Sequence, residues 1–293
     1  MPVADAGNAV LGFGRWTPEF SFSAGGGAWS ALYPPSNLNA LPLYLVGRTT
    51  SAQPGATRCT ATCPQRVPVR LLGLVHHNAS VNGRFRLSLY ADTALATLLH
   101  TTGWQEFWPP AFPLGALPFE SRNFWTGKYT PRQIANDMWT RPVWLPRTYL
   151  IQGLRLEVND PLNPAGFFEM GLLDIAQGHQ LQINFAPGSE FGFRFRTEEQ
   201  EALGGVAYPE RRDKPRVFRG TVENADHLRE VMPFFWEALR EHDLDVPMLW
   251  HPYPEQRTLW MRTCFLARLR DPGLIAHATA ETDRLPILLE EVL

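Results

Sequence analysis

Two adjacent histidines, His76 and His77, stand where the apolar stretch LLGLV meets the turn-forming residues NASVNG. Imidazole is a common metal ligand and general base, so this pair could do chemistry. Adjacent residues of a β-strand point to opposite faces of the sheet, however, and both side chains cannot easily bind one ion. The position favours a structural role at the end of a strand.

The cysteines offer a second possible metal site. Cys59 and Cys63 have the spacing C-x3-C, which zinc permits, and the two histidines follow them. A second ligand pair is missing, and Cys264 lies far along the chain. Three cysteines also give no even set for a disulfide-stapled secreted fold. We therefore expect no metal, no cofactor and no disulfide framework.

Catalytic motifs are not evident in the sequence. GFGRW at 12–16 lacks the third glycine and the strand-helix context of a dinucleotide site. A Ser-His-Asp triad is formed by residues that can be distant in sequence, so the sequence leaves this alternative open. Glycoside hydrolysis needs two converging acids, and the aromatic region offers only Glu106, Glu120 and Asp137, with no recognisable pair. We expect a protein that is not an enzyme, with no catalytic residues.

The segment 104–146 is rich in aromatic residues and contains seven prolines. A connection of this length is usually functional. Its tryptophans can pack against the body of the protein or a neighbouring subunit, which is the preferred interpretation, or they can stack against sugar rings. These candidate interface or sugar-stacking residues are Trp104, Trp108, Trp125, Trp139 and Trp144.

A run of charge, PERRDKPRVFR, covers residues 209–219. Such runs are usually solvated loops. The alternative is a basic cluster that faces another subunit, and its members would be Arg211, Arg212, Arg216 and Arg219.

The elements that position these residues are mostly short strands, because 26 prolines and 23 glycines break helices repeatedly. Residues 66–76 predict a buried strand, Asn82-Gly83 a turn with positive φ, and 84–92 a strand with Phe85, Leu87 and Leu89 inward. The best helix covers about 225–242. Its expected cap is Asn224 or Asp226, and its expected buried face comprises Leu228, Val231, Phe235, Ala238 and Leu239.

These elements predict a mainly β protein: an N-terminal arm or linker at 1–35, a jelly-roll β-sandwich at 36–186 that carries the insert 104–146, and a smaller β domain with one helix at 187–293. The net charge of −2 argues against a nucleic-acid partner. We find no signal peptide and no membrane-spanning stretch, so we expect synthesis in a cytoplasm and no membrane insertion.

Two stretches resemble a known family. LGLVHHNASVNGRFRLSLYAD is similar to the strand-turn-strand of galactose-binding-like jelly rolls, and YLIQGLRLEVNDPLNPAGFFEMGLLDIA to their closing strands. Residues 36–293 as a whole resemble tail-tip proteins of long-tailed bacteriophages and prophages. This resemblance includes the tryptophan-rich insert, the later strands GGVAYPERRDKPRVFRGTV and the ending TCFLARLRDPGLIAHATAETDRLPILLEEVL.

This resemblance implies a structural role in the virion: a tail-tip or baseplate component that forms a three- or six-fold ring and joins the tube or hub to attachment proteins. Its partners would be distal tail, hub and fibre proteins. The alternative is a carbohydrate-binding module for host-surface glycans, and a glycan-cleaving enzyme is third. Galactose-binding-like modules can hold calcium or sugar near positions such as Asp160 and Asn163, but the matching ligands are not evident and neither activity is transferred.

Overall fold

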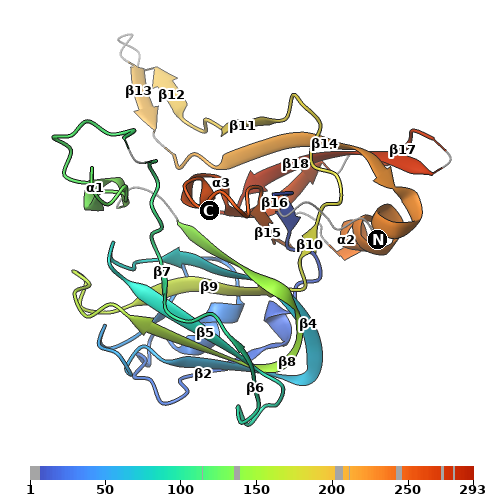
Figure 1. The fold of residues 1–293 in the computed structure, drawn as a ribbon. Helices are drawn as coiled ribbons and strands as arrows, with labels where there is room; N and C mark the ends of the chain where they lie inside the picture. The colour runs from blue at the N-terminus through green and yellow to red at the C-terminus, as the bar shows by residue number, and fades with distance from the viewer. Residues whose placement is uncertain are drawn as a thin grey trace. The chain divides into compact units, whose positions relative to one another are not determined.

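The computed structural model describes residues 7–113, 115–134, 139–201, 207–210, 212–241, 246–271, 274–279 and 281–293. The chain divides into two compact units (Figure 1). The sandwich unit comprises Ala9–Gln180 and Leu249–Cys264, and the helix unit comprises Met1–Asn8, Leu181–Met248 and Phe265–Leu293. None of the described helices is long and apolar enough to cross a membrane.

The sandwich unit is built from antiparallel strands in the order β3-β9-β4-β8-β5-β6, with β2 on β4 and β7 on β5. A separate small group of antiparallel strands has the order β10-β1-β15. Their bounds are β1 Val10–Leu11, β2 Ser21–Ser23, β3 Gly47–Arg48, β4 Cys59–His77, β5 Arg84–Tyr90, β6 Leu98–Thr101, β7 Gln105–Glu106, β8 Thr140–Asn159, β9 Glu169–Ala176, β10 His179–Gln180 and β15 Met248–His251. Short helices are η1 Thr17–Glu19, η2 Pro35–Asn39, α1 Pro131–Ile134 and α3 Trp260–Thr263.

The two longest strands, β4 and β8, each contribute to both layers of the sandwich. The first part of β4 pairs with β2 and the end of β8, whereas its last part pairs with β9 and the start of β8. The register shifts between Thr62 and Val67 and again between Val69 and Leu71. Such bulges bend a strand and increase its twist, which lets one strand pass from one layer to the other.

Alternate side chains along these strands point inward and fill the core between the layers. Phe85, Leu87 and Leu89 of β5 are fully buried, as their spacing predicts. Trp108 and Phe107, from the aromatic insert, are also fully buried in the same core. The mainly β fold class and the β-sandwich are thereby confirmed.

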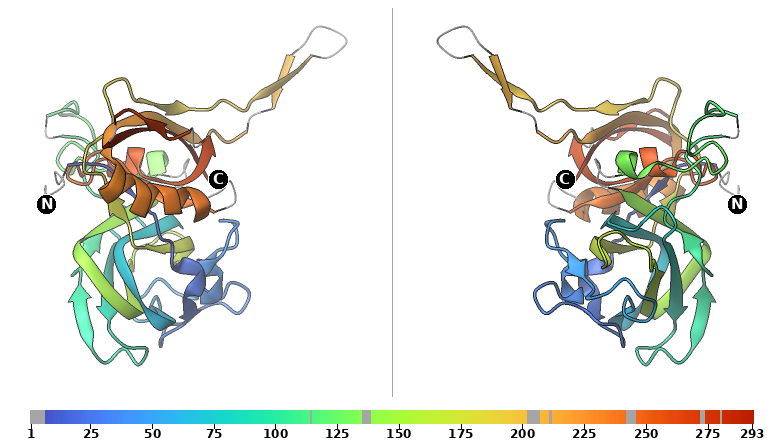
Figure 2. Two further views of the ribbon diagram at one scale, coloured as in Figure 1. Left: turned by 90° about the vertical axis from the view of Figure 1, so that its right-hand side faces the viewer. Right: turned by 90° about the vertical axis from the view of Figure 1, so that its left-hand side faces the viewer.

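The helix unit contains the sheet β11-β14-β18-β16, with β17 on β18, and a separate hairpin, β12–β13. Figure 2 shows this hairpin extending away from the sheet of its own unit. The bounds are β11 Glu190–Phe193, β12 Glu198–Glu201, β13 Ala207–Glu210, β14 Arg216–Asp226, η3 His227–Trp236, α2 Glu237–Glu241, β16 Phe265–Asp271, β17 Ala276–His277 and β18 Thr282–Glu291.

The helical segment begins at His227, because the Asp226 carboxylate accepts hydrogen bonds from the backbone N–H groups of Leu228 and Arg229 (3.0 and 2.9 Å). Asp226 was one of the two expected caps. The segment opens with ten residues of wide π-type turns. These turns shift the side chains around the axis, so the prediction that Leu228 is buried is wrong: it is 78% exposed, while Val231 and Phe235 are buried.

Three sequence expectations differ from the structure. The described part of the expected N-terminal arm packs into the sandwich: β1 is buried and β2 pairs with β4. Residues 249–264 belong to the sandwich unit although they were expected in the second domain. The turn at Asn82-Gly83 has no positive φ, and the strands that it joins, β4 and β5, are separated in the sheet by β8.

Candidate functional site

A row of side chains crosses the outer face of the sandwich unit from β4 to β7. Arg86 on β5 faces Glu157 on β8 in register, and the Glu157 carboxylate accepts hydrogen bonds from Nε and Nη2 of Arg86 (2.9 and 2.6 Å). Nη2 of Arg58, just before β4, donates to the other oxygen of Glu157 (3.2 Å). Trp104 completes the row, with its ring centre 4.9 Å from the guanidinium carbon of Arg86. We call these four residues the outer-face row.

Strand alternation explains why these residues point outward. Their chain neighbours Phe85, Leu87, Leu156 and Val158 are buried in the core, so residues 86 and 157 between them must face away from it. Trp104 follows β6 and precedes β7, the two short strands that pair with β5. The neighbouring strands therefore place the indole beside the outward side chain of Arg86.

The outer-face row combines a flat apolar ring with fixed polar groups. Trp104 is 44% exposed. The side chains of Arg86 and Arg58 are about one-third exposed, and that of Glu157 is 16% exposed. The two-point contact of Arg86 with Glu157 restrains both side chains. The row therefore presents guanidinium donors and carboxylate acceptors around a partly exposed indole, over which the Arg86 guanidinium lies. This set of groups suits a ligand with one apolar face and several hydroxyl groups.

The other candidate tryptophans have different environments. Trp125 is 77% exposed and contacts the rings of Phe119 and Phe124. Trp144 is half-buried, and the guanidinium carbon of Arg70 lies 4.1 Å from its ring centre.

Trp108 and Trp139 cannot stack against a sugar, because both are buried and pack against each other with ring centres 5.1 Å apart. The indole N–H of Trp108 donates to the carbonyl of Ala79 (2.9 Å). Both belong to the core of the sandwich unit, which corresponds to packing against the body of the protein, the interpretation preferred from the sequence, and not to sugar stacking.

His76 and His77 do not form a catalytic or metal centre. The ring of His77 is enclosed by Phe107 and Trp108, with centres 4.6 and 5.5 Å apart. Burial, with the nearby His76 and Arg141, lowers the pKa of His77 to about 3. His76 has positive φ and is only half-buried. The structural role expected for this pair agrees with their surroundings.

The three cysteines, Cys59, Cys63 and Cys264, are all buried. Burial raises the pKa of Cys59 to about 12, so its thiol is protonated near neutral pH. A protonated, enclosed thiol is a poor nucleophile and a poor metal ligand.

Asp160 and Asn163 stabilise a turn. The Asp160 carboxylate accepts hydrogen bonds from the backbone N–H of Ser80 (2.7 Å), from the hydroxyl of Ser80 and from the side-chain amide of Asn163 (3.0 Å). Because these donors already surround the buried carboxylate, it is not directed toward a cation.

Glu106 and Glu120, two of the acids considered for glycoside hydrolysis, have different surroundings. Glu106 pairs with Nζ of Lys128 (3.0 Å), and Glu120 is exposed in a turn. Asp137 lies outside the described residues.

The expected basic cluster does not form among its described members. Arg212 is exposed and pairs with Glu198 and Glu210 of the β12–β13 hairpin. Arg216 is buried and pairs with Glu291. Arg219 is exposed on β14. Arg211 lies outside the described residues. Alternation along β14 and pairing with β18 separate these arginines, which a reading of the charge run could not show.

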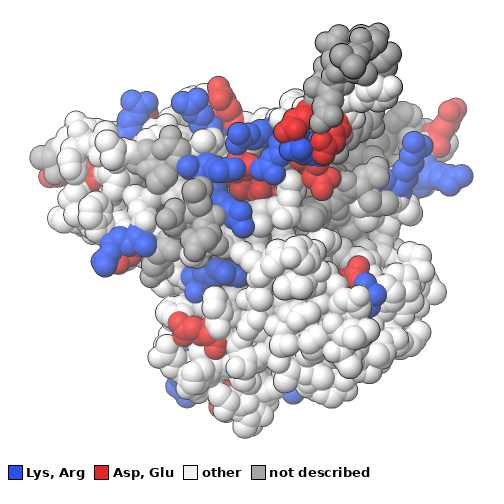
Figure 3. Space-filling view, turned by 180° about the vertical axis from the view of Figure 1, so that it is seen from behind, with Lys and Arg blue, Asp and Glu red and all other residues white. Residues whose placement is uncertain are grey.

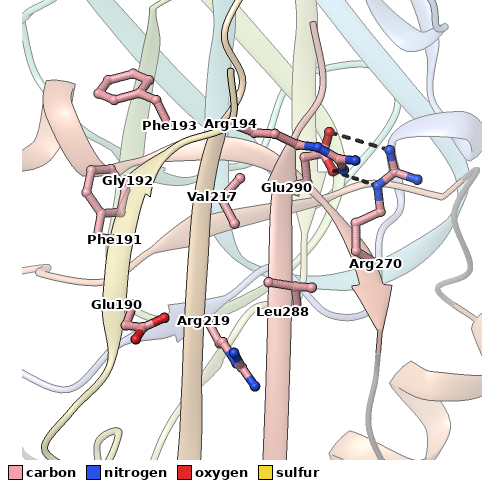
Figure 4. Close-up of a pocket in the computed structure, with 10 residues that line it drawn as sticks. All are labelled: Glu190, Phe191, Gly192, Phe193, Arg194, Val217, Arg219, Arg270, Leu288 and Glu290. Carbon is pink, nitrogen blue, oxygen red and sulfur yellow. Dashed lines mark hydrogen bonds and ion pairs between the residues drawn. The ribbon is translucent and has the colours of Figure 1, made fainter. Parts of the chain in front are cut away.

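A hollow of about 570 Å³ lies on the sheet of the helix unit (Figure 4). Val217 and Leu288 lie between the charged groups that line it. Arg194 and Arg270 both donate to Glu290 (3.1 and 2.7 Å). On the face shown in Figure 3, charged side chains gather over the helix unit and are sparse over the sandwich unit.

Comparison with known proteins identified no family model and no curated protein that matches this chain. Solved structures do match. The family 32 carbohydrate-binding module (CBM) of C. perfringens NanJ, in complex with galactose, is 11% identical, with 56% of this chain and 96% of that chain covered and a TM-score of 0.35. CBM32-1 of a family 31 glycoside hydrolase from Clostridium perfringens is 9% identical, with 54% and 94% covered and a TM-score of 0.33.

A third structure is truncated AlyQ, with CBM32 and alginate lyase domains. The match is 13% identical in sequence and covers 68% of this chain and 46% of that chain, with a TM-score of 0.31. At TM-scores below 0.5, these likenesses carry no argument about the ligand. The fold and the candidate site rest on the strands and side chains described above.

Proposed function

We propose that this protein binds carbohydrate, without cleaving it, through the outer-face row of the sandwich unit. The observation that carries the proposal is an exposed indole, Trp104, beside the restrained ion pair of Arg86 and Glu157. The glycan-binding alternative considered from the sequence depended on the tryptophans of the insert. Trp104 belongs to that set, is 44% exposed and lies beside an arginine that is paired with a glutamate.

The chemistry of a sugar ring fits this arrangement. A pyranose has an apolar C–H face, which packs against a flat aromatic ring, and hydroxyl groups at its rim. Arg86 and Arg58 supply donors, and Glu157 supplies acceptors. Because the ion pair already fixes these side chains, binding costs less side-chain entropy than it would with free arginines.

The first experiment is a glycan array with the full chain, followed by titration of the glycan that gives the strongest signal. Trp104→Ala should weaken binding at least tenfold, since loss of about 1.4 kcal/mol of ring contact changes affinity by that factor. Trp125→Ala is the matched control, because Trp125 is more exposed than Trp104 and lies outside the row.

Glu157→Gln tests the polar part of the row. The change keeps the shape of the side chain but removes the charge that holds Arg86 and Arg58, so we expect weaker binding with little change in fold. If Trp104→Ala and wild type bind the same glycan equally, or if the wild type binds no glycan on the array, the proposal is wrong.

A second candidate function, the tail-tip structural role implied by the resemblance, is favoured by the apolar surface of the helix unit. Phe193 and Phe195, at and just beyond the edge strand β11, are 57% and 74% exposed. Leu228, Met232 and Trp236 are also exposed, at spacings of four residues along the helical segment. Exposed aromatic and apolar groups of this kind are typical of protein interfaces.

In this second proposal, copies of the chain associate through the helix unit into a ring at the tail tip of a virion, and distal tail, hub or fibre proteins are the neighbours. Mass photometry of the full chain tests the self-association. We expect a closed oligomer for the wild type and a shift toward monomer for Phe193→Glu, with Leu162→Glu, an 80% exposed residue of the sandwich unit, as the control. A wild type that stays monomeric at all concentrations contradicts the ring.

A further inference from the structure

Two histidines and one aspartate converge at one end of the sheet of the helix unit. Nδ1 of His227 lies 2.6 Å from one carboxylate oxygen of Asp283, and Nδ1 of His277 lies 2.7 Å from the other. All three potential ligand atoms lie within 4.8 Å of one another. The carboxylate thus lies between two imidazoles, and we call these residues the His-Asp-His cluster.

Three separate segments build this cluster. His227 follows directly after β14 and begins the helical segment, and His277 ends the two-residue strand β17. Asp283 is near the start of β18, where it pairs in register with His277 and with Ala225 of β14. The backbone N–H of His227 also donates to the carbonyl of Glu281 (3.0 Å). Residues far apart in the sequence are therefore fixed close together by the sheet.

The burial of the three groups differs in a way that suits an ion held at the surface. The Asp283 side chain is 1% exposed, that of His227 is 25% exposed and that of His277 is 71% exposed. A buried carboxylate is costly unless it is paired, and here each of its oxygens is paired with an imidazole. The partly exposed rings leave a path by which an ion could enter from solvent.

We propose that the His-Asp-His cluster binds a divalent transition-metal ion, with zinc the best match. Zinc takes imidazole nitrogen and carboxylate oxygen as ligands at about 2.0–2.2 Å, usually four in a tetrahedron. The cluster supplies three ligands, and water or another group takes the fourth place. Each imidazole binds the ion as a neutral ligand through Nδ1 and keeps its proton on Nε2. A neutral ring in the Nδ1–H tautomer therefore shifts its proton to Nε2, and a protonated ring releases its Nδ1 proton to the buffer as the ion binds.

The present hydrogen-bonded distances require only a small movement. Two ligands about 2 Å from a tetrahedral ion are roughly 3.3 Å apart, whereas the nitrogen–oxygen distances here are 2.6 and 2.7 Å. His277 can move outward because it is on a short strand and mostly exposed. A bound ion would connect the ends of β14, β17 and β18, and so stabilise this end of the sheet.

The test uses the full chain, without a polyhistidine tag and after removal of metal with a chelator. Competition with a chromophoric chelator measures zinc affinity, and the visible spectrum of bound Co²⁺ reports its coordination. We expect one Zn²⁺ per chain and a higher melting temperature when zinc is present. His277→Ala and Asp283→Asn should each weaken binding at least about tenfold, because even groups that only support a ligand change affinity by 10–100-fold.

His277→Ala is the decisive variant, because its mostly exposed ring can be removed without opening the core. His100→Ala is the matched control: His100 is a partly exposed imidazole of the sandwich unit that contacts Tyr149 (3.1 Å). Equal zinc affinity in wild type and His277→Ala overturns the proposal. Loss of binding in His100→Ala with retention in His277→Ala overturns it as well, since the ion would then lie elsewhere.

Discussion

Acidification should destabilise this protein well above the pH at which carboxylates are protonated, and His77 is a main cause. Its ring is enclosed in the sandwich core, and burial lowers its pKa from 6.5 to about 3. In the unfolded chain the imidazole takes up a proton near pH 6.5, whereas in the folded chain it does so only near pH 3. Between these values the unfolded state binds more protons, so stability falls as the pH falls.

The magnitude follows from the two pKa values. At pH 5 the unfolded imidazole is 1.5 pH units below its ordinary pKa, which corresponds to about 2 kcal/mol of lost stability at about 1.36 kcal/mol per unit. His251 is also buried, with its pKa lowered to about 3 by burial and by Arg141, and should contribute a similar loss. Together these histidines should remove about 4 kcal/mol, a large part of the 5–15 kcal/mol typical of a folded domain.

Urea unfolding at pH 7 and pH 5 measures this loss, with His77→Met as the comparison. Neither ring nitrogen of His77 hydrogen-bonds to another residue in the described part of the chain, so methionine leaves no partner unsatisfied and occupies a similar volume. We expect the wild type to lose about 4 kcal/mol between pH 7 and pH 5, and the variant to lose about 2 kcal/mol because His251 remains. The Glu290 carboxylate adds little to this loss of stability, because its pKa is lowered and it stays ionised at pH 5.

The difference between the two proteins, rather than the total loss, tests the reasoning. His76, whose pKa burial also lowers, is present in both. If the wild type and His77→Met lose the same stability between pH 7 and pH 5, the buried imidazole of His77 does not cause acid sensitivity. A variant that is less stable than wild type at pH 7 but keeps the smaller pH dependence still supports the reasoning.

Three further results are expected. In the native protein, Cys59 should resist a thiol reagent near neutral pH and react only after unfolding, because its thiol is buried and its pKa is raised to about 12; absorbance of the released reagent measures this. Glu290→Gln should lower the free energy of unfolding by about 1–3 kcal/mol, because it removes the charged acceptor of Arg194 and Arg270, and urea unfolding would detect it. Asp226→Ala should cost about 1 kcal/mol by removing the helix cap, while Asp226→Asn should retain most of that stability.

Much of the fold could be predicted from local pattern, because strand alternation and helix capping act over a few residues. Period-two spacing placed Phe85, Leu87 and Leu89 in the core, and the helix begins after Asp226, one of the two caps that the sequence predicted. Leu228 was misplaced because wide turns change which side chains share a helical face. Nothing in the residue types around Leu228 distinguishes a π-type turn from an ordinary one.

The candidate sites were harder to predict, because they depend on which strands become neighbours. Alternation shows that Arg86 and Glu157 face outward, but only the pairing of β5 with β8 brings them together. The same holds for His227 and Asp283, which are 56 residues apart in the sequence. The tryptophans illustrate the opposite problem: one residue type, in one segment, supplies both the buried Trp108 and the exposed Trp104.

The segments of the two units alternate along the chain, and this has a consequence for protein synthesis. The helix unit takes Asn8, then Leu181–Met248, then Phe265–Leu293, and the sandwich unit needs Leu249–Cys264 to complete its packing. A ribosome would release most of the sandwich strands long before the segment that contains Leu249, which packs with Val10 and Leu71. The sandwich unit cannot close until residues 249–264 have emerged, and the helix unit also needs residues 265–293. A nascent fragment that stops at residue 186 would therefore expose apolar surface to chaperones rather than form a finished sandwich.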